Sequence, residues 1–434
     1  MLARVIGGGL AGAEAAYQLA IRGAEVELYE MRPVKQTPVH KGAGIAELVC
    51  SNSLKSADVN TAQGTLKEEM RLLGSVVLRA AYESRVPAGG ALAVDRELFS
   101  AKIEKALSDT GRVTVIRHEV TRIDENTIVA TGPLTSDKMA SEIEKKAGAE
   151  RLYFFDAAAP IITGDSVNRE KAFFAARYGK GDSDYLNCPM NKEEYLRFYD
   201  ELVNARKVIL KDFEKGELFE GCMPIEEMAR RGADAIRFGP LRPVGIKGKD
   251  GEKYYAVVQL RKEDVYDGLY NVVGFQTNLA FPEQERVFRL IPGLENAEFV
   301  RYGVMHRNTY LRSPGFLSAD FSVKNAPGVF FAGQITGVEG YMESAASGLI
   351  AGINLFRRMS GAETHVLPET TTIGSLQRYV AGYAGNFQPM HASFALTPPL
   401  ETKIKDKSLK KRAYSERALS DLEKYIENNK GVSL

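Results

Sequence analysis

The sequence is poor in cysteine, lacks long apolar runs and carries almost no net charge. Three cysteines occur among 434 residues, and 57 basic residues nearly balance 56 acidic ones, giving a formal charge of +1. This balance gives no polyanion-binding signature over the whole chain. So few cysteines, in no metal-ligand spacing, indicate a reduced intracellular protein without a metal site. No stretch approaches the roughly 18 apolar residues of a membrane helix, so we expect no membrane attachment.

The first thirty residues predict a strand, a glycine-rich turn, a helix and a second strand that ends in an acid. Gly7, Gly9 and Gly12 fill the G-x-G-x-x-G positions after the apolar run 2–6. In this fingerprint a diphosphate binds at the helix N-terminus, and the acid, here Glu30, binds ribose hydroxyls. A purely structural glycine turn is the alternative. We assign dinucleotide binding to Glu30 and to the whole turn, which consists of Gly7, Gly8, Gly9, Leu10, Ala11 and Gly12.

Two later segments resemble the flavin motifs of glutathione-reductase-like FAD proteins. A strand-like run ends at Gly333 and precedes a helical pattern over residues 343–352, and an earlier run ends at Thr131 and Gly132. Gln334 stands where this motif usually has an acid. The three motifs in this order imply FAD rather than NAD. Because no second G-x-G-x-x-G of similar quality occurs, we expect a nicotinamide donor to dock transiently on the flavin domain.

The order of these motifs divides the chain, which is too long for one ordinary domain. We predict an α/β fold in which an inserted α+β domain interrupts a Rossmann-type, glutathione-reductase-like FAD-binding domain. Residues 1–133 and 325–434 form the two parts of the FAD-binding domain, the second with a C-terminal helix, and residues 134–324 form the substrate domain. The early glycine turn leaves no room for a signal or transit peptide, so we expect a cytoplasmic protein.

Two of the three cysteines stand beside turn-forming residues and are therefore expected on loops. Cys50 lies in AELVCSNS and Cys222 in FEGCMPIE, whereas Cys188 lies in LNCPM. A thiol is only a few per cent ionised at pH 7, but the thiolate is strongly nucleophilic. The alternative for each cysteine is a small buried apolar residue, and we assign Cys188 to that class.

Around these cysteines the sequence closely resembles one family, the folate- and FAD-dependent tRNA (uracil-5-)-methyltransferases, called TrmFO, which are related to the MnmG flavoproteins. The resemblance runs from residue 7 to residue 390 and covers nearly the whole chain. Its most specific segments are AELVCSNS and FEGCMPIE. The other matching segments are GGGLAGAEAA, LYEMRPVKQTP, VPAGGALAVDR, GFQTNL, RYGVMHRNTY, FFAGQITGVEGYMESAASGLIAG and NFQPM.

The resemblance implies methylation of carbon 5 of the T-loop uridine in tRNA. In this chemistry a cysteine thiolate adds to carbon 6 of uracil, and carbon 5 then attacks the one-carbon unit of 5,10-methylenetetrahydrofolate. That unit has the oxidation level of formaldehyde, so a base must remove the carbon-5 proton and reduced FAD must supply a hydride. NADPH or NADH regenerates the reduced flavin. By resemblance Cys222 is the nucleophile and Cys50 the general base or its close partner, although sequence physics alone does not order the pair.

The resemblance also implies a folate pocket, with no stable protein partner evident. His306, in RYGVMHRNTY, is a candidate for stacking on the pterin or for proton transfer, and a hydrogen-bonded structural histidine is the alternative. Tyr341 and Glu343 are further candidates for this pocket, although Tyr341 could merely pack the start of its helix. Arg32, in LYEMRPVKQTP, is assigned to cofactor binding.

For the tRNA, the target uridine must leave its stack before a thiol can reach it, and phosphate contacts should supply most of the affinity. Arg230 and Arg231 follow Cys222 and are candidates to flank its site. A second basic cluster is explained equally well by RNA contact and by a solvated helix face. That cluster consists of Lys403, Lys405, Lys407, Lys410, Lys411, Arg412 and Arg417.

Three alternative functions remain open. The same chemistry on a ribosomal RNA uridine would use the same cysteine motifs. A related flavoprotein family installs aminomethyl groups on the tRNA wobble uridine with a partner GTPase, but its chains are longer and carry a helical C-terminal domain that this sequence lacks. A flavoprotein that serves only as a redox or structural module would give no reason for the two cysteine motifs.

Overall fold

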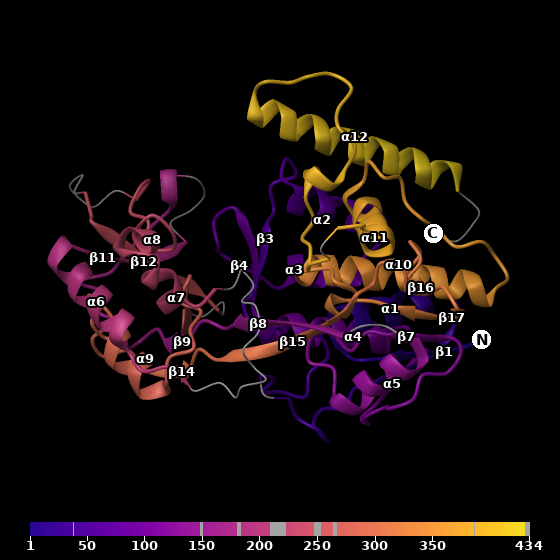
Figure 1. The fold of residues 1–434 in the computed structure, drawn as a ribbon, viewed down its shortest axis with the longest axis horizontal. Coiled ribbons are helices and arrows are strands. Elements are labelled where there is room, and N and C mark those ends of the chain that lie inside the picture. The colour runs from indigo at the N-terminus through magenta and orange to yellow at the C-terminus, as the bar shows by residue number, and fades with distance from the viewer. Residues whose placement is uncertain are drawn as a thin grey trace.

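In a computed structural model the chain forms a larger and a smaller lobe (Figure 1). The structure describes residues 1–37, 39–147, 151–179, 184–208, 223–246, 253–263, 267–385 and 387–429. The N-terminal part and the C-terminal part of the chain together build the larger lobe, and the middle part builds the smaller one. This arrangement is the one expected when a second domain is inserted into a dinucleotide-binding domain.

The larger lobe is built on a mostly parallel sheet in which strands from both ends of the chain lie side by side. β1 pairs in parallel with β2 on one side and with β7 on the other, and β17 pairs in parallel with β7. Ala3, Val5 and Ile6 of β1 are buried, as expected for a strand covered on both faces, whereas Leu2 at its start is exposed. In spatial order the strands are β16 (Ser322–Val323), β17 (Ala326–Phe331), β7 (Thr127–Val129), β1 (Leu2–Ile6), β2 (Glu25–Tyr29) and β6 (Val113–Ile116).

Helices α1 (Leu10–Ile21) and α10 (Tyr341–Met359) pack closely against each other, although they come from opposite ends of the chain. A Cβ atom added at Gly348 would lie 2.1 Å from the carbonyl oxygen of Ala11, which is far inside contact distance. Glycine at this position therefore allows the two helix backbones to approach. The close contact carries the N-termini of both helices to the same edge of the sheet.

The other helices of the larger lobe surround this pair. Side chains of Thr61, Ser75 and Asp95 each cap the helix that follows them, as serine, threonine and aspartate commonly do. These helices are α2 (Ala62–Leu72), α3 (Val76–Glu83), α4 (Arg96–Asp109), α5 (Asp137–Ala147), α11 (Thr372–Gly382) and α12 (Lys407–Asn428). A small antiparallel sheet accompanies them, with the strand order β3 (Ser53–Ser56), β5 (Ala91–Val94) and β4 (Arg85–Val86).

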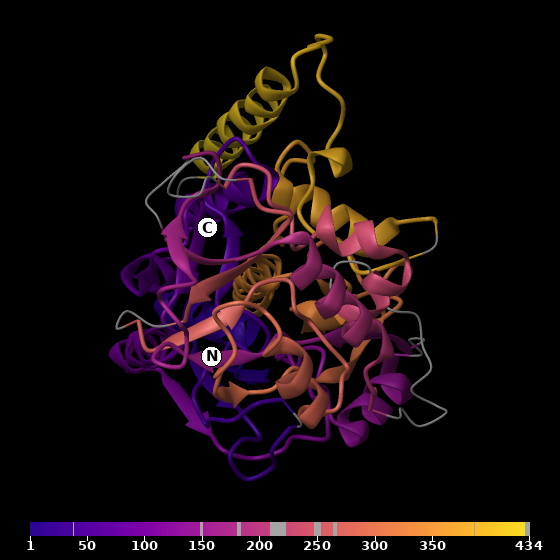
Figure 2. The same cartoon turned by 90° about the vertical axis from the view of Figure 1, so that its left-hand side faces the viewer.

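The long helix α12 extends along the top of the molecule in both views (Figures 1 and 2). It packs on α2 through Ser415, Ala418 and Leu422, while the basic residues of its first turns are exposed. Among the described residues, no helix combines the length and the apolar character that crossing a bilayer requires.

The smaller lobe is an antiparallel sheet with one face covered by helices. Leu186, Cys188 and Leu260 alternate along neighbouring strands and belong to the core under the helices, whereas Asn187 and Gln259 lie on the opposite, polar face. Burial raises the pKa of the Cys188 thiol to about 12. In spatial order the strands are β10 (Phe173–Ala175), β11 (Tyr185–Met190), β12 (Ala256–Lys262), β13 (Leu269–Val272), β9 (Ile161–Thr163) and β14 (Phe299–Arg301). The helices are α6 (Lys192–Asn204), α7 (Ile225–Arg230), α8 (Ala233–Arg237) and α9 (Phe281–Phe288).

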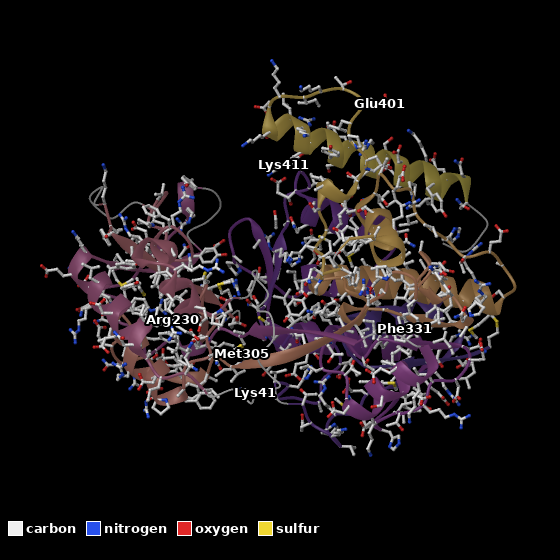
Figure 3. All side chains as sticks on the ribbon, in the orientation of Figure 1. Lys41, Arg230, Met305, Phe331, Glu401 and Lys411 are labelled. Carbon is white, nitrogen blue, oxygen red and sulfur yellow. The ribbon has the colours of Figure 1, made fainter. Side chains whose placement is uncertain are left out.

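An antiparallel pair of strands, β8 (Arg151–Ala157) and β15 (Met305–Leu311), runs between the two lobes. Met305 lies at the junction of the lobes (Figure 3). The core of the smaller lobe draws on residues between Ile162 and Ala297, and Leu311 already belongs to the core of the larger lobe. The division into residues 1–133, 134–324 and 325–434 stays a prediction.

The α1–α10 contact gives a stability prediction. Gly348→Ala should lower the free energy of unfolding by about 1–3 kcal/mol, because its methyl group would force the two helices apart. Gly382→Ala is the matched control, since Gly382 lies in α11 with no atom within 4 Å of an added Cβ. The control should leave the free energy unchanged or raise it by up to about 1 kcal/mol. Urea unfolding followed by circular dichroism measures both, and equal effects of the two substitutions would contradict the packing role.

Candidate cofactor and thiol site

A cleft opens at the edge of the parallel sheet where the N-termini of α1 and α10 meet. It contains about 1020 Å³ of empty space, part of which is open to solvent. Segments far apart in the sequence line it together, as expected at the carboxyl ends of strands in a doubly wound sheet. The residues from the sequence-based assignment that line it are Gly7, Gly8, Gly9, Leu10, Ala11, Glu30, Arg32, Gly333, Gln334 and Tyr341.

The glycine turn leaves one side of the cleft bare. A Cβ atom added at Gly12 would lie 1.8 Å from the carbonyl oxygen of Gly7, so Gly12 is required by the fold itself. A Cβ atom added at Gly9 would meet no protein atom within 4 Å and would instead fill the cleft. Gly9 is also the N-cap of α1, and no side chain caps this helix in the described part of the chain. Unsatisfied N–H groups beside open space are what a diphosphate binds.

Glu30 is held in place by a dense hydrogen-bond network. The Gly8 amide donates to Glu30 Oε2 at 2.9 Å, and Arg32 Nε donates to Glu30 Oε1 at 2.9 Å. Burial alone would raise the pKa of Glu30, but the hydrogen bonds and charge of Arg32, together with the Gly8 amide, outweigh burial and lower this pKa. Glu30 is therefore ionised at neutral pH and oriented as an acceptor at the cleft.

Arg32 lies on the wall of the cleft and is almost completely buried. Besides Glu30, its guanidinium binds Glu47 Oε2 at 2.6 Å and donates to the carbonyl oxygen of Gly44 at 3.1 Å. These bonds identify Arg32 as a support for the two carboxylates. Direct contact of Arg32 with a cofactor, as the sequence suggests, stays a prediction.

The second flavin-like motif closes the cleft from the other side. The Gly333 amide donates to Ser347 Oγ at 2.7 Å, and Gln334 Nε2 donates to Glu339 Oε2 at 2.5 Å. Across from them, Thr131 and Thr135 place hydroxyl groups 2.6 Å apart on the segment after β7. The cleft thus combines two helix N-termini, backbone amides, hydroxyls and one oriented carboxylate, and this donor set fits the diphosphate and ribose of FAD.

Cys50 lies next to this cleft. Its backbone amide donates to the hydroxyl oxygen of Tyr341 at 2.9 Å, and the Ser51 amide donates to the same oxygen at 3.4 Å. Tyr341 is the first residue of α10 and, like Val49, lines the cleft. The side chain of Cys50 is half-buried. The loop that carries the thiol is thus fastened to the helix start that faces the cofactor cleft.

For two of the predicted site residues the structure does not describe the side chain. Cys222 lies outside the described residues, and of His306 only the backbone, in β15, is described. Glu343 is buried and accepts a hydrogen bond from the Ala392 amide at 3.1 Å.

The described residues just after Cys222 are firmly anchored. The Ile225 amide donates to the carbonyl oxygen of Gln276 at 2.7 Å, and the Asn278 amide donates to Glu226 Oε1 at 2.7 Å. Burial raises the pKa of Glu226, although its hydrogen bonds from Asn278 and Thr277 oppose this shift. The FEGCMPIE and GFQTNL segments are therefore in direct contact.

Sequence reasoning missed His40, which also lines the cleft. Its Nδ1 lies 2.6 Å from Thr37 Oγ1. Burial and the charge of Arg32 lower the pKa of His40 to about 4, so the imidazole is neutral at pH 7. A single histidine outside any periodic pattern offers no local signal, and only the fold brings it to Glu30 and Arg32.

The sheet order, the glycine turn and the cleft define an α/β protein of the Rossmann-type dinucleotide-binding class, which confirms the predicted fold class. Residues 3–363 match the family described as glucose inhibited division protein A. The structure of GidA from Aquifex aeolicus has the same fold, with a TM-score of 0.70 at 16% identity over 98% of this chain and 73% of that chain.

Closer relatives are the proteins named methylenetetrahydrofolate--tRNA-(uracil-5-)-methyltransferase TrmFO. That of Natranaerobius thermophilus is 56% identical over 427 residues, 98% of each chain. That of Desulfitobacterium hafniense is 57% identical over 426 residues, 97% of this chain and 98% of the relative. The chain therefore belongs to the glucose inhibited division protein A family and, within it, to the TrmFO proteins.

A substitution at Gly9 tests whether the glycine turn binds the cofactor or serves only the fold. Gly9→Ala should weaken FAD binding about tenfold or more, because its methyl group would occupy space that the diphosphate needs. Its unfolding midpoint without FAD should stay unchanged. Gly90→Ala is the control, since Gly90 also has no neighbour within 4 Å but lies outside the cleft. Fluorescence titration with FAD measures both variants, and unchanged affinity of Gly9→Ala would remove the diphosphate from this position.

Proposed function

We propose that this chain methylates carbon 5 of the T-loop uridine in tRNA, with 5,10-methylenetetrahydrofolate as one-carbon donor and reduced FAD as reductant. Relatives named for methyl transfer to uracil carbon 5 of tRNA are 54–57% identical over nearly their whole length. The observation that carries the proposal is the hydrogen bond between the Cys50 amide and Tyr341 at the edge of the cleft. It joins a half-buried thiol to a dinucleotide site, which a purely redox protein would not need.

The first step of the proposed reaction is addition of a cysteine to carbon 6 of uracil. Carbon 5 becomes nucleophilic only after this addition, and it then bonds to the one-carbon unit of the folate. We assign the addition to Cys222. The hydrogen bonds of Ile225 and Glu226 to residues 276–278 support this assignment, because they hold the chain beyond Cys222 in a fixed place.

The second step removes the proton from carbon 5, and we assign it to Cys50. The carbon–hydrogen bond breaks, its electron pair stays on the pyrimidine, and the proton moves to sulfur. That electron pair then expels tetrahydrofolate by breaking its nitrogen–carbon bond to the one-carbon unit, which leaves a methylene group on carbon 5. FAD bound in the cleft in its reduced form would supply the hydride that turns this methylene into a methyl group, and the bond between Cys222 and carbon 6 then breaks to restore the pyrimidine. NADPH or NADH, docking from solution, is the source of the reducing electrons. Tyr341 and Glu343 are proposed to border the folate, and His306 to stack on its pterin or to assist proton transfer.

We further propose that tRNA contacts basic residues of both lobes. Lys411 lies near the end of α12 that faces the smaller lobe, and Arg230 lies on the smaller lobe itself (Figure 3). Both side chains belong to exposed positions, where phosphate contacts are available. Since the proposed substrate is tRNA, the cytoplasm is the proposed location, and no stable protein partner is proposed.

Reconstitution tests the function. Purified protein, unmodified tRNA, FAD, NADPH and 5,10-methylenetetrahydrofolate should produce 5-methyluridine, detected by mass spectrometry of the digested RNA. Omission of folate, FAD or NADPH should each abolish at least about nine-tenths of the product, since each supplies a distinct part of the methyl group or its electrons. A ribosomal RNA fragment is the parallel substrate. Product on ribosomal RNA alone would replace tRNA as substrate, and an aminomethyl product would replace the reaction.

The order of the two cysteines has its own test. A tRNA carrying 5-fluorouridine at the target position traps an adduct at carbon 6, because fluorine cannot leave as a proton does. Cys222→Ala should lose this covalent complex on denaturing gels, whereas Cys50→Ala should retain it while losing turnover. Cys188→Ala, at a buried position, is the control and should keep the complex. A complex that persists in Cys222→Ala and vanishes in Cys50→Ala would reverse the two roles.

A further inference from the structure

Residues 48–52, here called the Cys50 loop, form no helix or strand and are held largely by side chains. Arg96 donates from Nη1 to the carbonyl oxygen of Leu48 and from Nη2 to that of Cys50, the latter at 3.4 Å. Arg301 Nη2 donates to the carbonyl oxygen of Val49. Arginine side chains therefore bind three successive carbonyl groups of the loop.

A third arginine binds the far end of the same loop. Arg261 donates from Nη2 to Ser51 Oγ at 2.7 Å and from Nε to Asn52 Oδ1 at 2.8 Å. Arg96 begins α4 in the larger lobe, whereas Arg261 in β12 and Arg301 in β14 belong to the smaller lobe. Arginine side chains from both lobes thus bind one short loop.

Cations outnumber carboxylates around the Cys50 loop, where Arg96, Arg261, Arg301 and Lys41 face Glu263 and Glu47. Among the described residues, Glu263 is the carboxylate that pairs with these arginines, at 2.5 Å from Arg96 Nε and 3.9 Å from Arg261 Nη2. Lys41 adds a further positive charge nearby. Burial together with the charges of Arg301 and Arg96 lowers its pKa, and the charge of Glu47 opposes this shift. Burial and the charge of Arg96 also lower the pKa of Arg301. This mutual repulsion among cations is relieved when an anion lies between them.

The Cys50 thiol is close enough to two of these arginines to interact with them electrostatically. An ionised Cys50 acts electrostatically on Arg96 and Arg301, raising the pKa of each toward the charged form against the effect of burial. Burial and the charge of an ionised Cys50 raise the pKa of Tyr341 to about 12. Tyr341 therefore stays protonated at neutral pH, and besides Glu263 the thiolate of Cys50 is the anion that the arginines can favour.

We propose that Arg96 and Arg301 are positioning residues that hold Cys50 as a thiolate at the edge of the cofactor cleft, ready to accept a proton. Nearby cations lower the pKa of cysteine from about 8.5 to between 3.5 and 7.5 in other proteins. The proposal deepens the proposed function, since a thiolate is the form of Cys50 that can remove the carbon-5 proton. The proton then forms a sulfur–hydrogen bond, and the arginine charges favour its later release.

The test is the pH dependence of Cys50 alkylation by iodoacetamide, in which the thiolate displaces iodide and forms a sulfur–carbon bond. The full chain is used with FAD bound and with Cys222→Ser, and Cys188 is too buried to react. The midpoint of the rate against pH should lie below about 7.5. Arg96→Gln and Arg301→Gln should each raise it by about one unit or more, because each removes one positive charge. Arg96→Lys and Arg301→Lys should restore most of the shift.

Arg122→Gln is the matched control, because the Arg122 side chain is 78% exposed and pairs with Asp124 away from the Cys50 loop. It should leave the midpoint where it was. A midpoint near 8.5 in the parent protein, or glutamine variants that match the parent, would overturn the proposal. The FAD absorbance spectrum reports folding, and if Arg96→Gln fails to fold, the result for Arg301→Gln decides.

Failure of this inference is distinguishable from failure of the proposed function. Alkylation needs neither tRNA nor folate, so shifted midpoints in a protein without methyl transfer would leave the arginine assignment intact and refute the reaction. In an active protein, the acidic limb of the pH–rate profile for methyl transfer should move upward with the alkylation midpoint in Arg301→Gln. A profile that stays fixed while alkylation shifts would show that Cys50 is not the base.

Discussion

The site depends on the close packing of α1 against α10 beneath the glycine turn. This contact is possible because Gly348 presents no side chain to the backbone of Ala11. It brings the bare N-terminus of α1 and the N-terminus of α10 to one edge of the sheet, where Tyr341 then faces the cleft. Without this close approach, the glycine turn near the N-terminus and Tyr341, which binds the Cys50 amide, would not line the same cleft.

A second constraint is electrostatic and links the two lobes. Arg96 of the larger lobe and Arg261 and Arg301 of the smaller lobe all bind the Cys50 loop. The geometry of the thiol therefore depends on how the lobes meet. Buried cations of this kind are costly to desolvate unless polar groups satisfy them, and the loop carbonyls together with Glu263 fill that role.

The smaller lobe brings its own motifs together around the segment that follows Cys222. Glu226 binds Thr277 and the Asn278 amide, and Gln284 binds both the amide and the carbonyl of Gly303. Segments that resemble one family at separate places in the sequence are thus one connected structure. Gln284, which lies between two of these segments, binds the carbonyl oxygen of Leu279 as well as Gly303 and so connects them.

The sequence by itself determined the local elements: the first strand, the glycine turn, the helix after it, the acid at Glu30 and the loop position of Cys50. Those features depend on short-range sterics and on the period of apolar residues, both of which are visible in the sequence alone. Only the tertiary structure decided that Arg32 supports Glu30 and Glu47, that His40 joins the cleft, and that three arginines bind the Cys50 loop. Charged residues distant in sequence form no periodic pattern, and their partners are chosen by strand order and by the meeting of the lobes.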